Sequence, residues 1–514
     1  MTFEELASPS LPRFAGRVVP ALKNFYESIR MPALPAALMI GVPLALAVGL
    51  FALVREHALI NIDLVYYPLF VLVYAIWVFP ILGFMAFSYP GIKPYRSAAP
   101  KQRFICVVPA FNEQSVIGNP VRSLLAQDYP RDLYEVWVVF DGTDDTAEIA
   151  RSLGANVLIT PTDGFGKHRA LKYAFERLLR DDDDRYVCVF DADNTVSPNY
   201  LSAANNAIQE KGFKCLQSFH DVLNGSANWI TKALWCSCAT SSRVYLSGRY
   251  RMPGNTLICG TGWSCEASLL RKHWGTIRTQ TEDIELNGIL LLEEGITVGY
   301  VPEAHIYDEK PLNLWVSIRQ RMRWMCGHTR VAYYYFWPCV KEGIKRRNLA
   351  LLELAAYYLV PFALLASFLS FPLLAGLFVH VFKVTGPLAW NPIQIGFEIV
   401  AFFFIFVYQI VGFFPYNIDA PNGFVHTYRI LLYSLYTTIF ASLVWAPAVV
   451  WAFFRLTKQD WLYHTPHVTG VETNDLDDQR AERFKGLVSP FPMPSGSAIT
   501  HSVNDVEFEA EAVS

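Results

Sequence analysis

The sequence predicts an α/β domain with a largely parallel sheet, held at a membrane by flanking apolar helices. Only 17% of the 514 residues are charged, against roughly a quarter in soluble domains, and 53% are hydrophobic. This composition argues against a purely soluble enzyme and excludes a disordered chain. A mean hydropathy of +0.24 is nevertheless too low for a chain made mostly of membrane spans. A membrane protein with a large water-soluble part is therefore expected.

The water-soluble part is expected in the middle of the chain, where short apolar runs alternate with helical stretches. Short runs rich in valine and aromatic residues cannot cross a bilayer and fit buried parallel strands. Such strands are expected at Phe104–Val108, Val136–Phe140, Val157–Ile159 and Tyr186–Phe190. Crossover helices are expected at Ser115–Ala126, Thr146–Leu153 and Lys167–Leu179. Strands that alternate with helices are typical of a parallel sheet.

Uncharged apolar stretches on both sides of this domain are long enough to cross the membrane. Two precede it, at Ala33–Val54 and Leu64–Tyr89, and three follow it, at Leu349–Val379, Pro392–Pro415 and Ile430–Phe454. Four basic residues before the first stretch place the N-terminus and the central domain on the cytoplasmic side. The stretch Leu349–Val379 contains Pro361 and Pro372, so a broken or re-entrant helix is the alternative there. The number of spans after the domain therefore does not determine on which side of the membrane the C-terminal tail lies.

The chain divides into six predicted segments. They are a basic cytoplasmic or interface segment (1–32), two transmembrane helices (33–90), the α/β domain (100–312), interface helices (313–348), about three transmembrane helices (349–456) and an acidic, disordered tail (457–514). The interface segment holds eight basic residues and one acidic residue, which favours a helix facing anionic lipids over one that binds nucleic acid. The nine cysteines are expected as reduced thiols.

Acidic residues follow two of the predicted strands. Asp141 follows the second, and Asp191 and Asp193 follow the fourth. Open α/β sheets bind ligands at the carboxyl ends of their strands, so these side chains are expected to share one site. Helix capping explains the polar residues after Asp141, but it does not explain two acids one residue apart. Such a pair is typical of Mg²⁺ or Mn²⁺ that also holds substrate phosphates.

Three further segments carry residues suited to chemistry. Lys167 begins a predicted helix and could reach a phosphate there, although an ordinary helix-start lysine is an equal alternative. Glu282 and Asp283 open another helix, where either carboxylate could act as a general base. The alternative for Glu282 and Asp283 is that they only begin a helix that Thr281 caps, without a catalytic role.

The third segment is an amphipathic helix in the basic block. Trp315, Ile318, Met322 and Met325 form an apolar face that can lie on the membrane or on the domain. Gln320, Arg323 and Trp324 lie on another face and offer a donor, a cation and a flat ring. A cation suits a diphosphate leaving group, and a ring suits a sugar. The alternative is a membrane-surface helix without chemistry.

These residues resemble the motifs of membrane-embedded processive family-2 glycosyltransferases, the group of cellulose, chitin, hyaluronan and poly-N-acetylglucosamine synthases. The order and approximate spacing of the D, DxD, TED and QxxRW motifs are matched by Asp141, Asp191-x-Asp193, Thr281-Glu282-Asp283 and Gln320-x-x-Arg323-Trp324. The resemblance covers about residues 65–455. Because Ile284 follows Asp283, the acid motif looks nearer to exopolysaccharide, cellulose-like and mannan-like enzymes than to hyaluronan synthases.

The resemblance implies a GT-A (Rossmann-like) fold, an inverting mechanism, a nucleotide-sugar donor, with UDP-hexose favoured, and a Mg²⁺ or Mn²⁺ cofactor. It implies that Asp283, with Glu282 beside it, acts as the catalytic base and that Asp193 binds the metal. The residues implied in donor binding are Asp141, Lys167, Asp191, Gln320 and Arg323. The residues implied in acceptor binding are Trp324 and, from the loop before the acid motif, Trp263.

The expected function is elongation of a β-linked polysaccharide, coupled to its export through a multi-pass protein of the cell (inner) membrane. The alternative in the same chemistry is transfer of one sugar to a lipid acceptor. An alternative of another class is a non-catalytic transporter or scaffold with a degenerate transferase domain. The expected partners are the donor, the polysaccharide or lipid acceptor and membrane lipids, with accessory export subunits or a second copy as further candidates and no nucleic acid.

Overall fold

The computed structural model describes residues 79–88, 92–161, 166–225, 227–369, 406–413 and 423–454. Several predicted features lie outside these residues. They are the segment 1–32, the first span, most of the second span, residues 370–405 and the acidic tail from 457 onwards. The α/β domain and the interface segment are described almost completely.

A single eight-stranded sheet holds the described strands, in the order β3-β2-β1-β4-β7-β6-β8-β5. The strands are β1 (Phe104–Ala110), β2 (Tyr134–Phe140), β3 (Asn156–Ile159), β4 (Tyr186–Val189), β5 (Asn194–Val196), β6 (Cys215–Val222), β7 (Trp263–Glu266) and β8 (Gly299–Asp308). β1 to β4 pair in parallel, and β6 pairs in parallel with β8. β7 runs antiparallel to β4 and β6, and β5 runs antiparallel to β8.

The four predicted strands and the three predicted crossover helices are confirmed. The helices are α5 (Gly118–Leu125), α6 (Thr146–Ser152) and α7 (Lys167–Leu178). The expectation of a largely parallel sheet is correct for β1 to β4, but the whole sheet is mixed. The reason is tertiary: β7 enters the centre of the sheet antiparallel to both β4 and β6, and β5 pairs antiparallel with β8.

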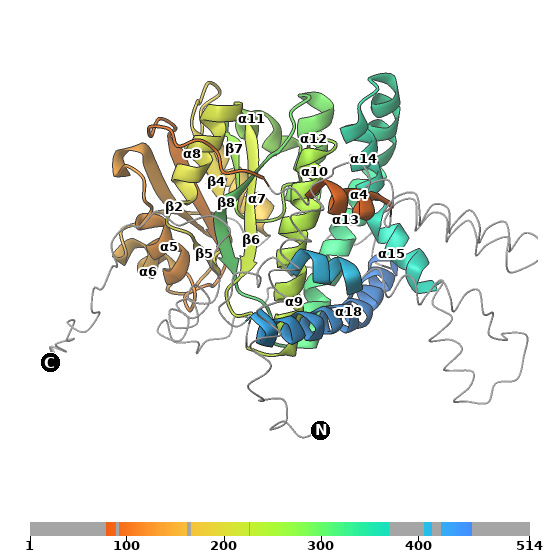
Figure 1. Ribbon diagram of the computed structural model, residues 1–514. Coiled ribbons are helices and arrows are strands. Elements are labelled where there is room, and N and C mark those ends of the chain that lie inside the picture. Colours follow the sequence, from red (N-terminus) through yellow and green to blue (C-terminus); the bar gives the residue numbers. More distant parts are fainter. Residues whose placement is uncertain are drawn as a thin grey trace, which may run out of the picture.

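Helices cover both faces of the sheet and enclose two apolar cores. On one face, α5 and α8 (Tyr200–Lys211) pack through residues such as Leu124 and Leu201. On the other face, α7, α11 (Ala267–His273) and α12 (Glu282–Glu293) pack through residues such as Phe175 and Leu286. The domain is therefore a three-layer α/β/α arrangement, with the sheet drawn in orange to green in Figure 1.

A group of helices lies beside the sheet, on the right in Figure 1. The group is α4 (Phe79–Ser88), α9 (Trp229–Thr240), η4 (Ser241–Leu246), α10 (Ser247–Arg251), α13 (Leu314–Lys345), α14 (Leu349–Tyr358), α15 (Val360–Leu369) and α18 (Gly423–Phe454). α13 packs along both α14 and α18, and also against α12 of the domain. It is the helix that connects the α/β domain with the apolar helices.

The described apolar helices can be compared with parts of the predicted membrane spans. α14 ends at Tyr358 and α15 starts at Val360, so the described part of Leu349–Val379 is interrupted, as the alternative of a broken helix expects. In the described part of the chain, one helix, Arg429–Ala452, is long and apolar enough to cross a membrane. The remaining predicted spans stay predictions.

Candidate active site

Asp283 is the second residue of α12 and lies half-buried beside the loop that precedes β7. Its Oδ2 accepts a hydrogen bond from the backbone N–H of Gly260 at 2.7 Å. Asn287, one turn later, donates to the carbonyl of Asp283 and also bonds the backbone of Ile258, which holds α12 against this loop. Burial and the neighbouring carboxylate of Glu282 raise the pKa of Asp283 to about 6, and the ammonium of Lys167 acts in the opposite direction. A carboxylate with this pKa is suited to general-base chemistry near neutral pH.

Lys167 lies at the start of α7 and connects three parts of the site. Its Nζ donates to Asp191 Oδ1 at 2.5 Å and to the carbonyl of Gly260 at 2.6 Å. The carboxylate of Glu282 lies 3.6 Å away. Burial opposes the charge on Lys167, but Asp191 and Glu282 outweigh it and raise the pKa of the ammonium above its ordinary value. Lys167 is therefore charged at any physiological pH.

The loop Cys259–Gly262 is fixed from both sides. Gly260 and Gly262 have φ angles of +64° and +65°, which favour glycine. A Cβ at Gly262 would lie 2.5 Å from Ser218 Oγ, so the sheet leaves no room for a side chain there. Thr261 Oγ1 accepts a hydrogen bond from the backbone N–H of Asp191 at 3.0 Å. Through Thr261 and Gly260, the loop is therefore hydrogen-bonded both to Asp191 after β4 and to Asp283 at the start of α12.

Asp141 and Asp191 follow β2 and β4, which both pair in parallel with β1. Their backbones therefore lie at the same edge of the sheet. Asp141 is buried, and its backbone N–H donates to the carbonyl of Ala110 at the end of β1. Asp193 is half-buried and accepts a hydrogen bond from Asn194 Nδ2 at 3.1 Å. The predicted donor-side acids thus share one sheet edge.

The oxygen ligands at this edge suit Mg²⁺ or Mn²⁺. Such ions usually take one or two carboxylates from the protein and complete their coordination with water and substrate phosphates. Within the described ranges, no cluster of three or more His, Cys, Asp or Glu side chains could hold a metal by itself. Asp193 is one half-buried carboxylate of this kind at the sheet edge.

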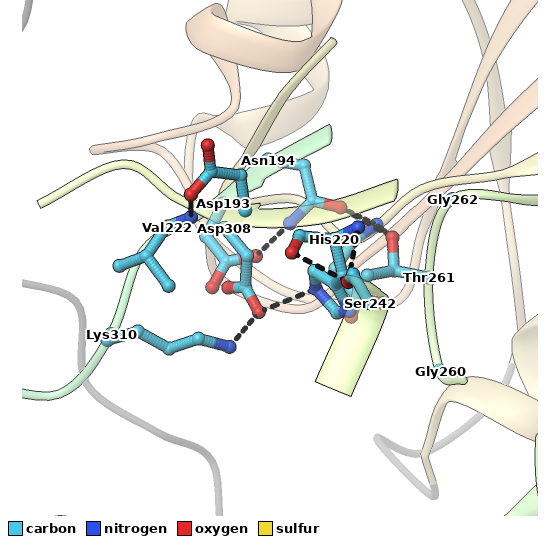
Figure 2. A network of polar contacts seen from close by, with 12 residues as sticks. Asp193, Asn194, His220, Val222, Ser242, Gly260, Thr261, Gly262, Asp308 and Lys310 are labelled. Atoms are coloured by element: carbon cyan, nitrogen blue, oxygen red, sulfur yellow. Dashed lines mark hydrogen bonds and ion pairs between the residues drawn. The ribbon is translucent and has the colours of Figure 1, made fainter. Parts of the chain in front are cut away.

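A second polar cluster beside Asp193 escaped the sequence prediction (Figure 2). Asp308, the last residue of β8, pairs with Lys310 and lies 3.2 Å from His220 Nε2. The pairing of β5 with β8 brings Asn194 opposite Asp308, which explains why the cluster adjoins Asp193. Burial opposes the charge of Asp308, but Lys310 and His220 hold the pKa of this carboxyl well below its usual range.

The helix α13 presents the predicted QxxRW residues. Gly327 of α13 contacts Thr281, the residue before α12, so closely that a Cβ at Gly327 would lie 2.4 Å from Thr281 Cγ2. Arg323 precedes Gly327 by four residues and Gln320 precedes Arg323 by three, so all three share one face of the helix. The Nε of Arg323 is buried and has no hydrogen-bond partner among the described residues. This face of α13 is therefore turned towards the start of α12.

The two tryptophans predicted to bind the acceptor differ in their surroundings. Trp324 is half-buried, and its ring centroid lies 6.4 Å from that of Trp445 in α18. Trp263 is completely buried in the sheet, stacks on Trp274 and donates to the carbonyl of Gly260 at 3.3 Å. In this position Trp263 supports the loop through its hydrogen bond to Gly260. The acceptor role stays a prediction for both Trp324 and Trp263.

The model of the glycosyltransferase like family 2 matches residues 100–327. This region is a glycosyltransferase family 2 domain. The match covers the sheet, the loop before β7, α12 and the first turns of α13, and the family-2 domain has the mixed α/β, Rossmann-like GT-A fold.

Curated relatives of the family-2 domain are glycosyltransferases. A beta-monoglucosyldiacylglycerol synthase from Synechocystis is 28% identical over 59% of this chain and 62% of its own length. An N-acetylglucosaminyltransferase from Mesorhizobium japonicum is 24% identical over 72% of this chain and 83% of its own length. A solved mannosyltransferase from Pyrobaculum calidifontis, in complex with GDP-Man and Mn²⁺, aligns with a TM-score of 0.48 and 16% identity over 76% of this chain and 99% of its own. The chain spans about three fifths of the length of the Synechocystis enzyme.

Proposed function

We propose that the family-2 domain transfers a sugar from a nucleotide-sugar donor to an acceptor hydroxyl with inversion at the anomeric carbon. The observation that carries the proposal is the position of Asp283. Its half-buried carboxylate lies at the start of α12, connected through Gly260 and Lys167 to Asp191 at the carboxyl ends of the parallel strands. A base and a donor-binding edge in this arrangement suit attack on a bound sugar from the side opposite its leaving group.

In the proposed reaction, Asp283 takes the proton of the acceptor hydroxyl as its oxygen bonds to the anomeric carbon. The bond between that carbon and the diphosphate breaks, and the nucleoside diphosphate leaves with the bonding electrons. Arg323 and Gln320 would hold the diphosphate from α13. The buried Nε of Arg323, which has no hydrogen-bond partner among the described residues, supports this role. Asp141 and Asp191 would contact the nucleoside. A divalent ion held by Asp193 and the phosphates would stabilise the negative leaving group.

The base is tested with Asp283→Asn in the full-length protein, in membranes or detergent. Transfer is expected to fall by about 10²–10⁴-fold, because the amide cannot accept the proton. Binding of the nucleoside diphosphate with Mn²⁺ is expected to stay unchanged. Asp181→Asn is the matched control, since the Asp181 side chain is 91% exposed and its charge lies outside the site. Unchanged transfer by Asp283→Asn would reject Asp283 as the base, whereas absence of transfer by the wild type would favour a non-catalytic scaffold.

The proposed donor is a UDP-hexose. Membranes that contain the full chain are incubated with labelled UDP-glucose, UDP-N-acetylglucosamine, UDP-glucuronate or GDP-mannose, with Mn²⁺ present. One of the UDP-sugars is expected to be consumed. Turnover of GDP-mannose alone would overturn the UDP assignment, and no turnover with any donor would overturn the proposed function.

The proposed acceptor is a growing β-linked polysaccharide that leaves through the apolar helices. Support comes from the tryptophan pair Trp324–Trp445, where the QxxRW helix meets α18. Transfer to a lipid is the second candidate, and it is favoured by the 28% identity with a glycolipid synthase. Extraction of the labelled product decides between them. A polymer that resists organic extraction is expected, and a lipid that carries one sugar would reject processive synthesis.

A further inference from the structure

Lys167 occupies a position that donor binding alone does not explain. Its ammonium touches Asp191 and the carbonyl of Gly260, and it lies 3.6 Å from Glu282. The predicted role was a contact with a phosphate at the start of α7. The structure instead surrounds this ammonium with groups that belong to both halves of the site.

The backbone of Gly260 is hydrogen-bonded on both sides of its Cα. Its carbonyl accepts from Lys167 and from Trp263 Nε1, and its N–H donates to Asp283 Oδ2 at 2.7 Å. The carbonyl and the N–H lie in the two neighbouring peptide groups, so a change of φ or ψ at Gly260 would move one relative to the other. Two donors on the carbonyl therefore restrain the backbone of Gly260 in the conformation that bonds Asp283.

We propose that Lys167 is a positioning residue that joins the donor-side carboxylate Asp191 to the proposed base Asp283 through the backbone of Gly260. This inference rests on the proposed function and adds a role that substrate contact does not include. Lys167 orients the base and also places a positive charge beside it, which lowers the pKa of Asp283.

The charge argument follows from the groups around Asp283. Asp191, Glu282 and Asp283 place three carboxylates around one ammonium. Without Lys167 their mutual repulsion would be relieved by a proton, and Asp283 would take it first because burial already raises its pKa to about 6. Other ionisable groups near Asp283 or in contact with α12 include Cys259 in the loop, Tyr357 and Tyr358 on α14, and Tyr335 on α13.

The test measures kcat/KM against pH for full-length Lys167→Met, Lys167→Arg and wild type. The acidic limb of the Lys167→Met profile is expected to move to higher pH by about one unit or more. The loss of kcat/KM relative to the wild type is therefore expected to become smaller as the pH rises. Lys167→Arg keeps the charge and is expected to keep the wild-type limb. Lys172→Met is the matched control on α7, since Lys172 is exposed and pairs only with Glu176 among the described residues.

Each outcome decides the inference. An unshifted limb in Lys167→Met, with only a higher KM for the donor, would overturn it and leave a phosphate contact. A thermal unfolding transition checks that the variant is folded. If Lys167→Met lacks this transition, Lys167→Gln, which can still donate to the carbonyl of Gly260, takes its place with the same expected shift. Failure of the proposed function is seen separately, as absence of transfer by the wild type.

Discussion

At the scale of single residues, Asp283 combines a fixed hydrogen bond with a raised pKa. The N–H of Gly260 orients one carboxylate oxygen, and burial with the charge of Glu282 makes the group more basic than an exposed aspartate. The sequence motif predicts that an acid stands here. The pKa also depends on Gly260 and Lys167, which lower it and are 23 and 116 residues away along the chain.

The first prediction concerns the pH dependence of the wild-type enzyme. Asp283 must be ionised to accept a proton, and its pKa is about 6. The value of kcat/KM is therefore expected to be low below pH 6, to rise as the pH passes about 6 and then to level off. Initial rates at subsaturating donor between pH 4.5 and 8.5 measure this, with thermal unfolding at each pH as the control. A limb near pH 4, the ordinary aspartate value of about 3.9, would contradict it.

Arg321 shows how residues of one motif are separated by the tertiary structure. It is buried, and its guanidinium lies 4.9–5.4 Å from the ring centroids of Trp324, Phe440 and Trp445. Arg323, two residues later, lies on the face of α13 that carries Gly327. The QxxRW pattern includes Arg323 and leaves Arg321 at a variable position. Arg321 lies in the interface with α18, whereas Arg323 lies on the face of α13 that is turned towards α12.

At the scale of secondary-structure elements, α13 contacts both the family-2 domain and the apolar helices. Met322 and Met325 pack against Ala448 and Val449 of α18, so most of the predicted apolar face is covered by protein. Trp315, from the same predicted face, is 56% exposed. The opposite contact, at Gly327, brings the helix against the start of α12. The position of Arg323 therefore depends on a glycine that no motif includes.

The second prediction tests this contact with Gly327→Val. The added side chain would overlap Thr281, so α13 must move away from α12. Overpacking of this kind costs about 1–3 kcal/mol of stability, and transfer activity is expected to fall more than the unfolding temperature does. Thermal unfolding and kcat/KM are measured together. Gly275→Ala is the control, because nothing lies within 4 Å of a Cβ there. Wild-type activity in Gly327→Val would separate this contact from catalysis.

Strand β6 illustrates why the second half of the sheet was not predicted. Its sequence carries buried polar residues, including Gln217, Ser218 and Asp221, and lacks the apolar run of β1 or β4. Gln217 uses these polar atoms to hold the loop before β7: its Oε1 accepts from the N–H of Cys259, and its Nε2 donates to the carbonyl of Thr261. A pattern of hydrophobicity cannot identify a strand whose side chains are satisfied by distant hydrogen bonds.

At the scale of the whole molecule, the catalytic domain and the apolar helices share a continuous interface. One apolar cluster contains Ile284 and Leu291 of α12, Val331 of α13 and Leu354 of α14. A further stripe on α18 faces outwards, with exposed fractions between 38% and 50%. Its residues are Leu431, Leu435, Ile439 and Leu443. An exposed apolar stripe on the candidate span suits contact with lipid.

The third prediction is that the full-length protein sediments with membranes and is released by detergent but not by carbonate at high pH. Ile439→Glu places a charge on the exposed stripe of α18 and is expected to weaken insertion by about 2–3 kcal/mol, seen as a larger carbonate-released fraction. Ile159→Glu is the matched control, since Ile159 is an exposed apolar residue of β3 in the family-2 domain. Release of the wild type by carbonate would contradict membrane embedding.

The sequence by itself determined the first four strands, their crossover helices and the acids at the strand ends, because short apolar runs and strand-end carboxylates are local patterns. Only the tertiary structure decided that β7 enters the sheet antiparallel, that Trp263 is buried, and that Asp308 joins the cluster beside Asp193. These features depend on hydrogen bonds and packing between residues far apart in the chain. The same reason applies to Lys167, whose three partners come from the end of β4, the loop before β7 and the start of α12.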